Sequence, residues 1–156
     1  MIRSVVAAVA IVAAAACGAD DTMSNDQPDA GGSGDPDGGN TCTKPALDAT
    51  WLASYVTSIT TSIPAPRATT TQRNAARTYL QQQFVQLGLS PQTHSYNSGA
   101  NIYATVAATG GDARAIIVGA HFDTVTNSPG ANDNASGVAA VLAVARYVSE
   151  MPCRGR

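Results

Sequence analysis

Two short stretches decide the fold of this chain: residues 116–125, IIVGAHFDTV, and residues 129–138, PGANDNASGV. The first is an apolar run that ends in a His-Phe-Asp triplet, as a strand ends at the edge of a sheet. In the second, Asp133 comes directly before small residues that open a helix. Loops at one end of an open α/β sheet are where such folds place their sites. The two stretches therefore predict an α/β fold in which a histidine and two carboxylates share one edge of the sheet.

The segments around these stretches show the periodicity of helices and strands. Apolar residues at three- and four-residue spacing predict helices over Leu47–Ile63, Thr71–Leu87 and Ala135–Ser149. Alternating apolar residues and turn signals predict strands over Gln92–Tyr96 and Ile102–Ala108. The continuous apolar run Ala115–Ala120 predicts a strand covered on both faces. This order of helices and strands predicts an α/β domain with a mixed sheet.

Residues 1–17 have the anatomy of an export signal. A short positive start is followed by the apolar run Ser4–Ala16, which is too short for a membrane-spanning helix of about 20 residues. The small residues before Cys17 resemble a bacterial lipoprotein box, which implies cleavage before Cys17 and its lipidation. The alternative is ordinary cleavage after Ala16, which leaves an unmodified cysteine. We expect an exported protein, either an outer-membrane or cell-surface lipoprotein or a secreted or periplasmic protein.

Residues 18–41 differ in composition from the rest of the chain. They are rich in Asp, Gly, Asn, Ser and Pro, and they hold six of the 11 acidic residues. Such a segment cannot bury enough apolar surface to offset the chain entropy lost on folding, which favours a flexible acidic tether. From Cys42 onward the basic residues are dispersed and are not interleaved with aromatic residues. Nucleic-acid binding therefore has no support.

Three side chains of the two quoted stretches are suited to bind or orient zinc, which takes imidazole nitrogen and carboxylate oxygen as ligands. His121 ends a rigid strand, and Asp123 is placed to accept its second ring N–H, as carboxylates near metal-bound histidines do. Asp133 follows in the next loop, and one carboxylate can bridge two metal ions. Taken singly, these are a strand-end residue, a turn residue and a helix cap. Their order and spacing favour a metal site.

The two stretches together resemble the co-catalytic zinc aminopeptidases of metallopeptidase family twenty-eight (clan MH). The resemblance is close over Gly119–Val138 and extends in layout over Leu47–Glu150. It implies a three-layer, zinc exopeptidase-like α/β fold with a mixed, mostly parallel sheet. It also implies two zinc ions and peptide substrates that lose their N-terminal residues. Apart from peptide substrate and possible membrane attachment through Cys17, we expect a monomer.

The resemblance assigns roles to residues by position. It makes His121 a ligand of one zinc and Asp123 the carboxylate that orients His121. It makes Asp133 the aspartate that bridges both zincs, and it implies a cis peptide bond from Asp133 to Asn134.

The remaining site residues of that family have no match in this chain. They are a Glu-Glu pair after the next strand, whose first member is the general base, then an Asp and a His. Glu150 lies at the far end of the last helix, about 22 Å from its start at 1.5 Å per residue. His94 precedes the motif and is interpreted as structural. We therefore expect residues 42–156 to be the N-terminal part of a truncated peptidase domain, with an incomplete sheet and weak or absent zinc binding.

Two alternatives to the aminopeptidase remain open. The chain can be a catalytically inactive lipoprotein module or remnant, or it can belong to another branch of the same fold, such as a carboxypeptidase or a glutaminyl cyclase. Export also permits disulfides. Cys42 and Cys153 are either bridged or two free thiols, and the sequence does not decide between these states.

Overall fold

The structure of the chain is a computed structural model that describes residues 8–14, 43–46, 48–62, 66–108, 115–152 and 154. Its elements follow the chain in this order: β1 (Ala8–Ala14), α1 (Ala49–Ser62), α2 (Thr70–Gln86), β2 (Gln92–Tyr96), β3 (Gly99–Val106), β4 (Ala115–His121), a short turn η1 (Ala131–Ala135) and α3 (Ser136–Glu150). All six helices and strands expected from Leu47 onward are present, which confirms the α/β class.

The four strands form one mixed sheet in the order β2-β3-β1-β4. β2 and β3 are an antiparallel hairpin, while β1 runs parallel to β3 and antiparallel to β4. A turn as short as Asn97-Ser98 can join only antiparallel strands. The expectation of a mostly parallel sheet is therefore not met by these four strands, because two of their three neighbouring pairs are antiparallel.

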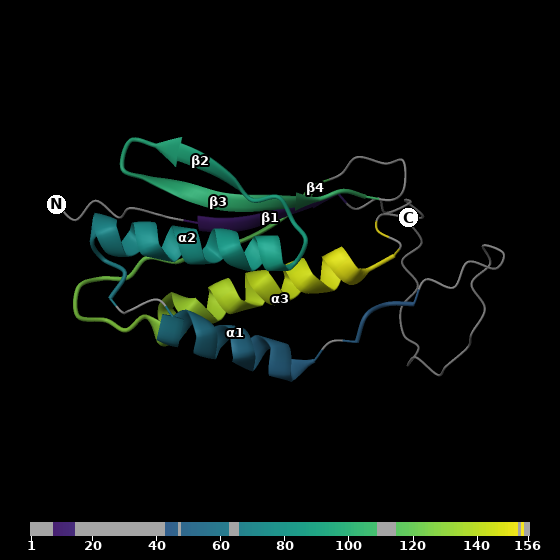
Figure 1. Ribbon diagram of the computed structural model, residues 1–156, viewed down its shortest axis with the longest axis horizontal. Coiled ribbons are helices and arrows are strands. Elements are labelled where there is room, and N and C mark those ends of the chain that lie inside the picture. The colour runs from purple at the N-terminus through teal and green to yellow at the C-terminus, as the bar shows by residue number, and fades with distance from the viewer. Residues whose placement is uncertain are drawn as a thin grey trace, which may run out of the picture.

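The three helices lie on the same side of the sheet (Figure 1). α2 and α3 contact the strands, and α1 packs on α3. The expected three-layer arrangement is not seen in the part of the chain that the structure describes. The described helices cover only one face of the sheet.

The hydrophobic core lies between α2, α3 and the covered face of the sheet. The apolar stripes expected on both helices are buried there, together with the alternate residues of β3. Its fully buried members include Leu80, Phe84, Ile102, Ala104, Phe122, Val138, Val141, Leu142 and Ala145. Burial of a large apolar side chain stabilises the folded state by about 1.5–3 kcal/mol, so this core fixes the position of α3 on the sheet.

A polar capping box defines the start of α2, and a glycine defines its end. Thr69 and Gln72 form a capping box, in which each side chain accepts a hydrogen bond from the other residue's backbone N–H. At the other end Gly88 has φ +73°, as expected for a glycine that ends a helix. The segment before α2 is therefore tied closely to the start of the helix.

β4 differs from its prediction. Its continuous apolar sequence predicts burial on both faces, but Ile116 and Ile117 are 52% and 70% exposed. Successive side chains of a strand point to opposite faces. Ile117 points to the face opposite the described helices and meets none of them there. Ile116 lies on the same face as the buried Ala120, but near the start of the strand, where it stays half exposed. The strand itself and its C-terminal end at His121 are placed as expected.

β1 occupies the inner position between β3 and β4, and its seven residues lie inside the predicted export signal. Residues rich in Val, Ile and Ala suit an inner strand as well as the apolar core of a signal. The assignment of residues 1–17 as a signal stays a prediction. Residues 18–41 and the cysteines Cys17, Cys42 and Cys153 lie outside the described residues. None of the helices in the described ranges has the length and hydropathy needed to cross a membrane.

The core packing of α3 can be tested with Leu142→Ala. We expect this change to lower the free energy of unfolding by about 2–5 kcal/mol, because it leaves a cavity at a fully buried position. Denaturant unfolding measures the effect. Val85→Ala is the control, since Val85 is 61% exposed and its truncation should change stability by less than about 0.5 kcal/mol. Equal losses in the two variants would show that α3 does not pack as described.

Candidate metal centre

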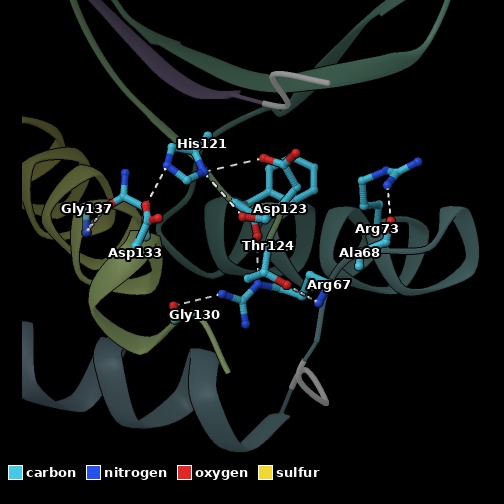
Figure 2. A network of polar contacts seen from close by, with 11 residues as sticks. Arg67, Ala68, Arg73, His121, Asp123, Thr124, Gly130, Asp133 and Gly137 are labelled. Carbon is cyan, nitrogen blue, oxygen red and sulfur yellow. Dashed lines mark hydrogen bonds and ion pairs between the residues drawn. The ribbon is translucent and has the colours of Figure 1, made fainter. Parts of the chain in front are cut away.

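His121 stands between the two predicted carboxylates at the end of β4 (Figure 2). Its Nδ1 lies 3.3 Å from the backbone oxygen of Asp123 and 3.4 Å from the carboxylate Oδ1 of the same residue. Its Nε2 lies 3.0 Å from Oδ1 of Asp133. The structure thus brings all three sequence-predicted site residues together, with one ring nitrogen facing each aspartate.

Asp133 is held beside His121 by the turn η1, which leads into α3. Its side chain is 85% exposed, and its backbone is extended rather than helical. The peptide bond from Asp133 to Asn134 is cis, as the family resemblance implies. Asn134 then accepts a 3.0 Å hydrogen bond from the backbone N–H of Gly137, which satisfies a donor in the first turn of α3. The carboxylate therefore projects from a fixed turn into solvent next to the imidazole.

The donor set fits part of a zinc site. A neutral imidazole carries one ring proton, so only one of the two nitrogens can donate to its neighbouring aspartate. With the proton on Nδ1, Nε2 presents a lone pair to a carboxylate oxygen 3.0 Å away, an arrangement that a cation stabilises. Two ligands of one tetrahedral zinc at 2.0–2.1 Å would lie about 3.3 Å apart, close to this separation.

The fit is incomplete because catalytic zinc takes three protein ligands. No group of three or more His, Cys, Asp and Glu side chains suited to hold a metal is found among the described residues. Glu150 does not contribute, since it pairs with Arg146 at the other end of α3. His94 lies on the exposed strand β2, opposite Asn101.

Arg67 is a residue of this region that the sequence did not reveal. It is fully buried, and its guanidinium donates hydrogen bonds to the backbone carbonyls of Phe122, Pro129 and Gly130. These carbonyls lie at the two ends of the loop between Asp123 and Asp133. An isolated arginine after a proline carries no periodicity or spacing signal, so only the fold identifies it.

Gly130 allows the loop to approach Arg67. Its φ is +60°, a conformation that L side chains rarely adopt. A Cβ at this position would lie 2.2 Å from Cγ2 of Thr124 and 2.6 Å from Nη2 of Arg67. The carbonyl of Gly130 accepts hydrogen bonds from both Arg67 and the backbone N–H of Ala135. Glycine is therefore required here by both conformation and space.

Comparison with known proteins identifies the segment that carries this site. Residues 101–155 match the family described as Peptidase family M28. This segment belongs to peptidase family M28. All three predicted site residues lie within the M28 segment, and peptidases of this family are generally zinc-dependent.

Two curated relatives match over 64 residues each. One is the "Probable lipoprotein aminopeptidase LpqL" of Mycobacterium tuberculosis, 42% identical over 41% of this chain and 12% of the relative. The other is the "Vacuolar membrane protease" of Schizosaccharomyces japonicus, 39% identical over 40% of this chain and 8% of the relative. The match therefore spans about a tenth of the length of these relatives. No solved structure matches the chain significantly.

The close approach in the M28 segment can be tested with Gly130→Ala. We expect a loss of stability larger than that of Gly88→Ala, the matched control. Both glycines have positive φ, where an alanine costs about 1–2 kcal/mol. An added Cβ at Gly88 meets nothing within 4 Å, whereas at Gly130 it overlaps Thr124 and Arg67, which adds about 1–3 kcal/mol of overpacking. Thermal unfolding of both variants measures the difference, and equal losses would refute the close approach.

Proposed function

We propose that this chain is part of an exported zinc aminopeptidase, in which His121, Asp123 and Asp133 form half of a two-zinc site. The observation that carries the proposal is the position of His121, whose two ring nitrogens lie next to two different aspartates. Membership of the segment in peptidase family M28 supports peptide hydrolysis. The printed name of one relative, a probable lipoprotein aminopeptidase, supports the removal of N-terminal residues.

Each of the three residues has a separate role in the proposed site. His121 Nε2 and the Asp133 carboxylate would hold the metal, and Asp133 would bridge the two ions. Asp123 would keep the proton on Nδ1 of His121, which faces its backbone oxygen at 3.3 Å and its carboxylate Oδ1 at 3.4 Å, and this leaves Nε2 free as a ligand. When bound, zinc acts as a Lewis acid that activates water and polarises the scissile carbonyl. The exposed position of Asp133 leaves this side of the site open to a peptide.

The whole reaction needs groups that the described residues do not supply. We propose that further zinc ligands and a glutamate general base complete the site in the full-length protein, together with further strands that extend the sheet toward the three-layer, mostly parallel fold. The small share of the relatives' length that this chain matches is consistent with this proposal. Residues 1–156 alone would then bind zinc weakly.

Zinc content and activity test the proposed function. The protein expressed from its complete gene should bind zinc and should release the chromophore from a leucine p-nitroanilide with a free amine, but not from its N-acetylated form. We expect Asp123→Asn to weaken zinc binding by about 10–100-fold, the usual effect of losing a residue that orients a metal-bound histidine. His121→Ala and Asp133→Ala should weaken it further, because each removes a ligand.

His94→Ala is the matched control, because His94 is the other of the chain's two histidines and lies exposed on β2. This variant should keep its zinc and its activity. Unchanged zinc affinity in His121→Ala would refute the proposed site. Zinc binding without hydrolysis of either substrate would indicate an inactive module, and release of C-terminal residues or cyclisation of N-terminal glutamine would indicate another branch of the fold.

The location of the protein has its own test. We propose that the export signal ends at Cys17 and that this cysteine carries the lipid anchor, a view supported by the word lipoprotein in the name of one relative. Cys17→Ser should move the processed protein from the membrane fraction to the soluble fraction, because the acyl chains that hold it are lost. Cell fractionation and immunoblotting measure the change. An unchanged distribution would show that Cys17 is not lipidated.

A further inference from the structure

Arg67 is the one charged side chain that is fully buried among the described residues. Burial lowers the pKa of this guanidinium from its ordinary value, and the nearby negative charge of Asp123 opposes the change. An arginine keeps its charge in proteins, and a buried charge is costly unless it is fully hydrogen-bonded. The arrangement around Arg67 must therefore supply compensating partners.

Those partners are backbone carbonyls of a single loop. Nε donates to Phe122 O at 2.6 Å, Nη2 to Gly130 O at 3.0 Å and Nη1 to Pro129 O at 3.4 Å. Phe122 lies between the two site residues His121 and Asp123, and Gly130 lies three residues before Asp133. One planar guanidinium thus joins the beginning and the end of the loop that separates the two zinc ligands (Figure 2).

The backbone of Arg67 adds two more links to the same loop. Its N–H donates to Oγ1 of Thr124 at 2.7 Å, and its carbonyl accepts from the N–H of Thr124 at 3.3 Å. On its other side Arg67 is followed by the capping box of Thr69 and Gln72, which fixes the start of α2. Arg67 therefore connects the loop to a rigid helix that is itself part of the core.

The link at Gly130 continues directly into the metal-binding turn. Gly130 O accepts from Arg67 and also from the N–H of Ala135, so the guanidinium and the turn η1 share one acceptor. Displacement of Gly130 would move η1 and with it the carboxylate of Asp133. Displacement of Phe122 O would move the ring of His121 and the carboxylate of Asp123, its chain neighbours.

We infer that Arg67 is a positioning residue for the metal centre, which holds the end of β4 and the turn η1 at the separation that lets His121 and Asp133 bind one metal ion. This inference rests on the proposed zinc site. Arg67 touches neither the metal nor the substrate, because it is buried beneath the loop. Its planar group with several donors suits it to bind carbonyls on both sides at once, which a lysine cannot do.

The test compares Arg67→Met with Arg73→Met in the protein expressed from its complete gene. Methionine keeps length and apolar bulk but removes every donor. Arg73 is the matched control because its described hydrogen bonds go to backbone and hydroxyl oxygens near the start of α2, at Ala68 and Thr70, and not to the loop. Zinc affinity is measured by competition with a chromophoric chelator, and the cobalt-substituted site is followed by its visible absorption spectrum.

We expect Arg67→Met to weaken zinc binding by about 10–100-fold, in the range seen when groups behind metal ligands are lost, and to change the cobalt spectrum. Arg73→Met should leave the zinc affinity within about twofold of the wild type and the cobalt spectrum unchanged. Arg67→Lys should recover part of the affinity, since one ammonium group can bind one end of the loop. Should Arg67→Met fail to fold, Thr124→Val removes one link of Arg67 to the loop with little change in shape and should weaken zinc binding several-fold.

The outcomes separate this inference from the proposed function. Wild-type protein that binds no zinc overturns both. Wild-type protein that binds zinc, with Arg67→Met equal to it in affinity and cobalt spectrum, overturns only the role of Arg67 and leaves the zinc site standing. Equal losses in the Arg67 and Arg73 variants would also overturn it, because they would trace the effect to general stability.

Discussion

The packing of α3 against the sheet determines where the two parts of the site meet. Its buried face, which includes Val138, Leu142 and Ala145, fixes the helix on the sheet through contacts that have no polar component. The turn that opens α3 consequently lies beside the end of β4, and Asp133 comes within 3.0 Å of His121 although a loop separates them. An apolar interaction thus sets the distance between two polar side chains.

The loop between these elements adds the precision that apolar packing cannot provide. Hydrophobic contacts have no preferred direction, whereas a guanidinium binds carbonyls in a fixed planar pattern. Arg67 is placed where this directionality is needed, between Phe122 and Gly130. Gly130 makes the approach feasible, because any side chain at its position would enter the space of Arg67 and Thr124.

Local patterns in the sequence predicted most of the elements. The helical spacing over Thr71–Leu87 and the alternation over Ile102–Ala108 are set by residues close together in the chain, and the helix and the strand that they predict are confirmed. The meeting of His121, Asp123 and Asp133 was predicted for the same reason, since the motif lies within one strand, one loop and one helix start.

Features that depend on distant segments escaped prediction. The burial of Arg67 requires partners 55 and 63 positions further along the chain, at Phe122 and Gly130, and no local spacing encodes that contact. The apolar run of β4 predicts that both faces are covered, but Ile117 is 70% exposed because the described helices lie on the opposite face. The order of the strands in the sheet could not be predicted either, because the pairing of an inner strand depends on segments that are distant in the sequence.

The inner position of β1 has a consequence for any processed form of this protein. β1 pairs through five residues with β3 and through seven with β4, so it joins the two halves of the sheet. A chain without residues 1–16 would hold β3 and β4 on either side of a gap roughly 9–10 Å wide, twice the ordinary strand spacing. Both edges of the gap would present unpaired backbone donors and acceptors, which bind extended segments readily. The sheet of a precursor and the sheet of its cleaved product therefore cannot consist of the same four strands.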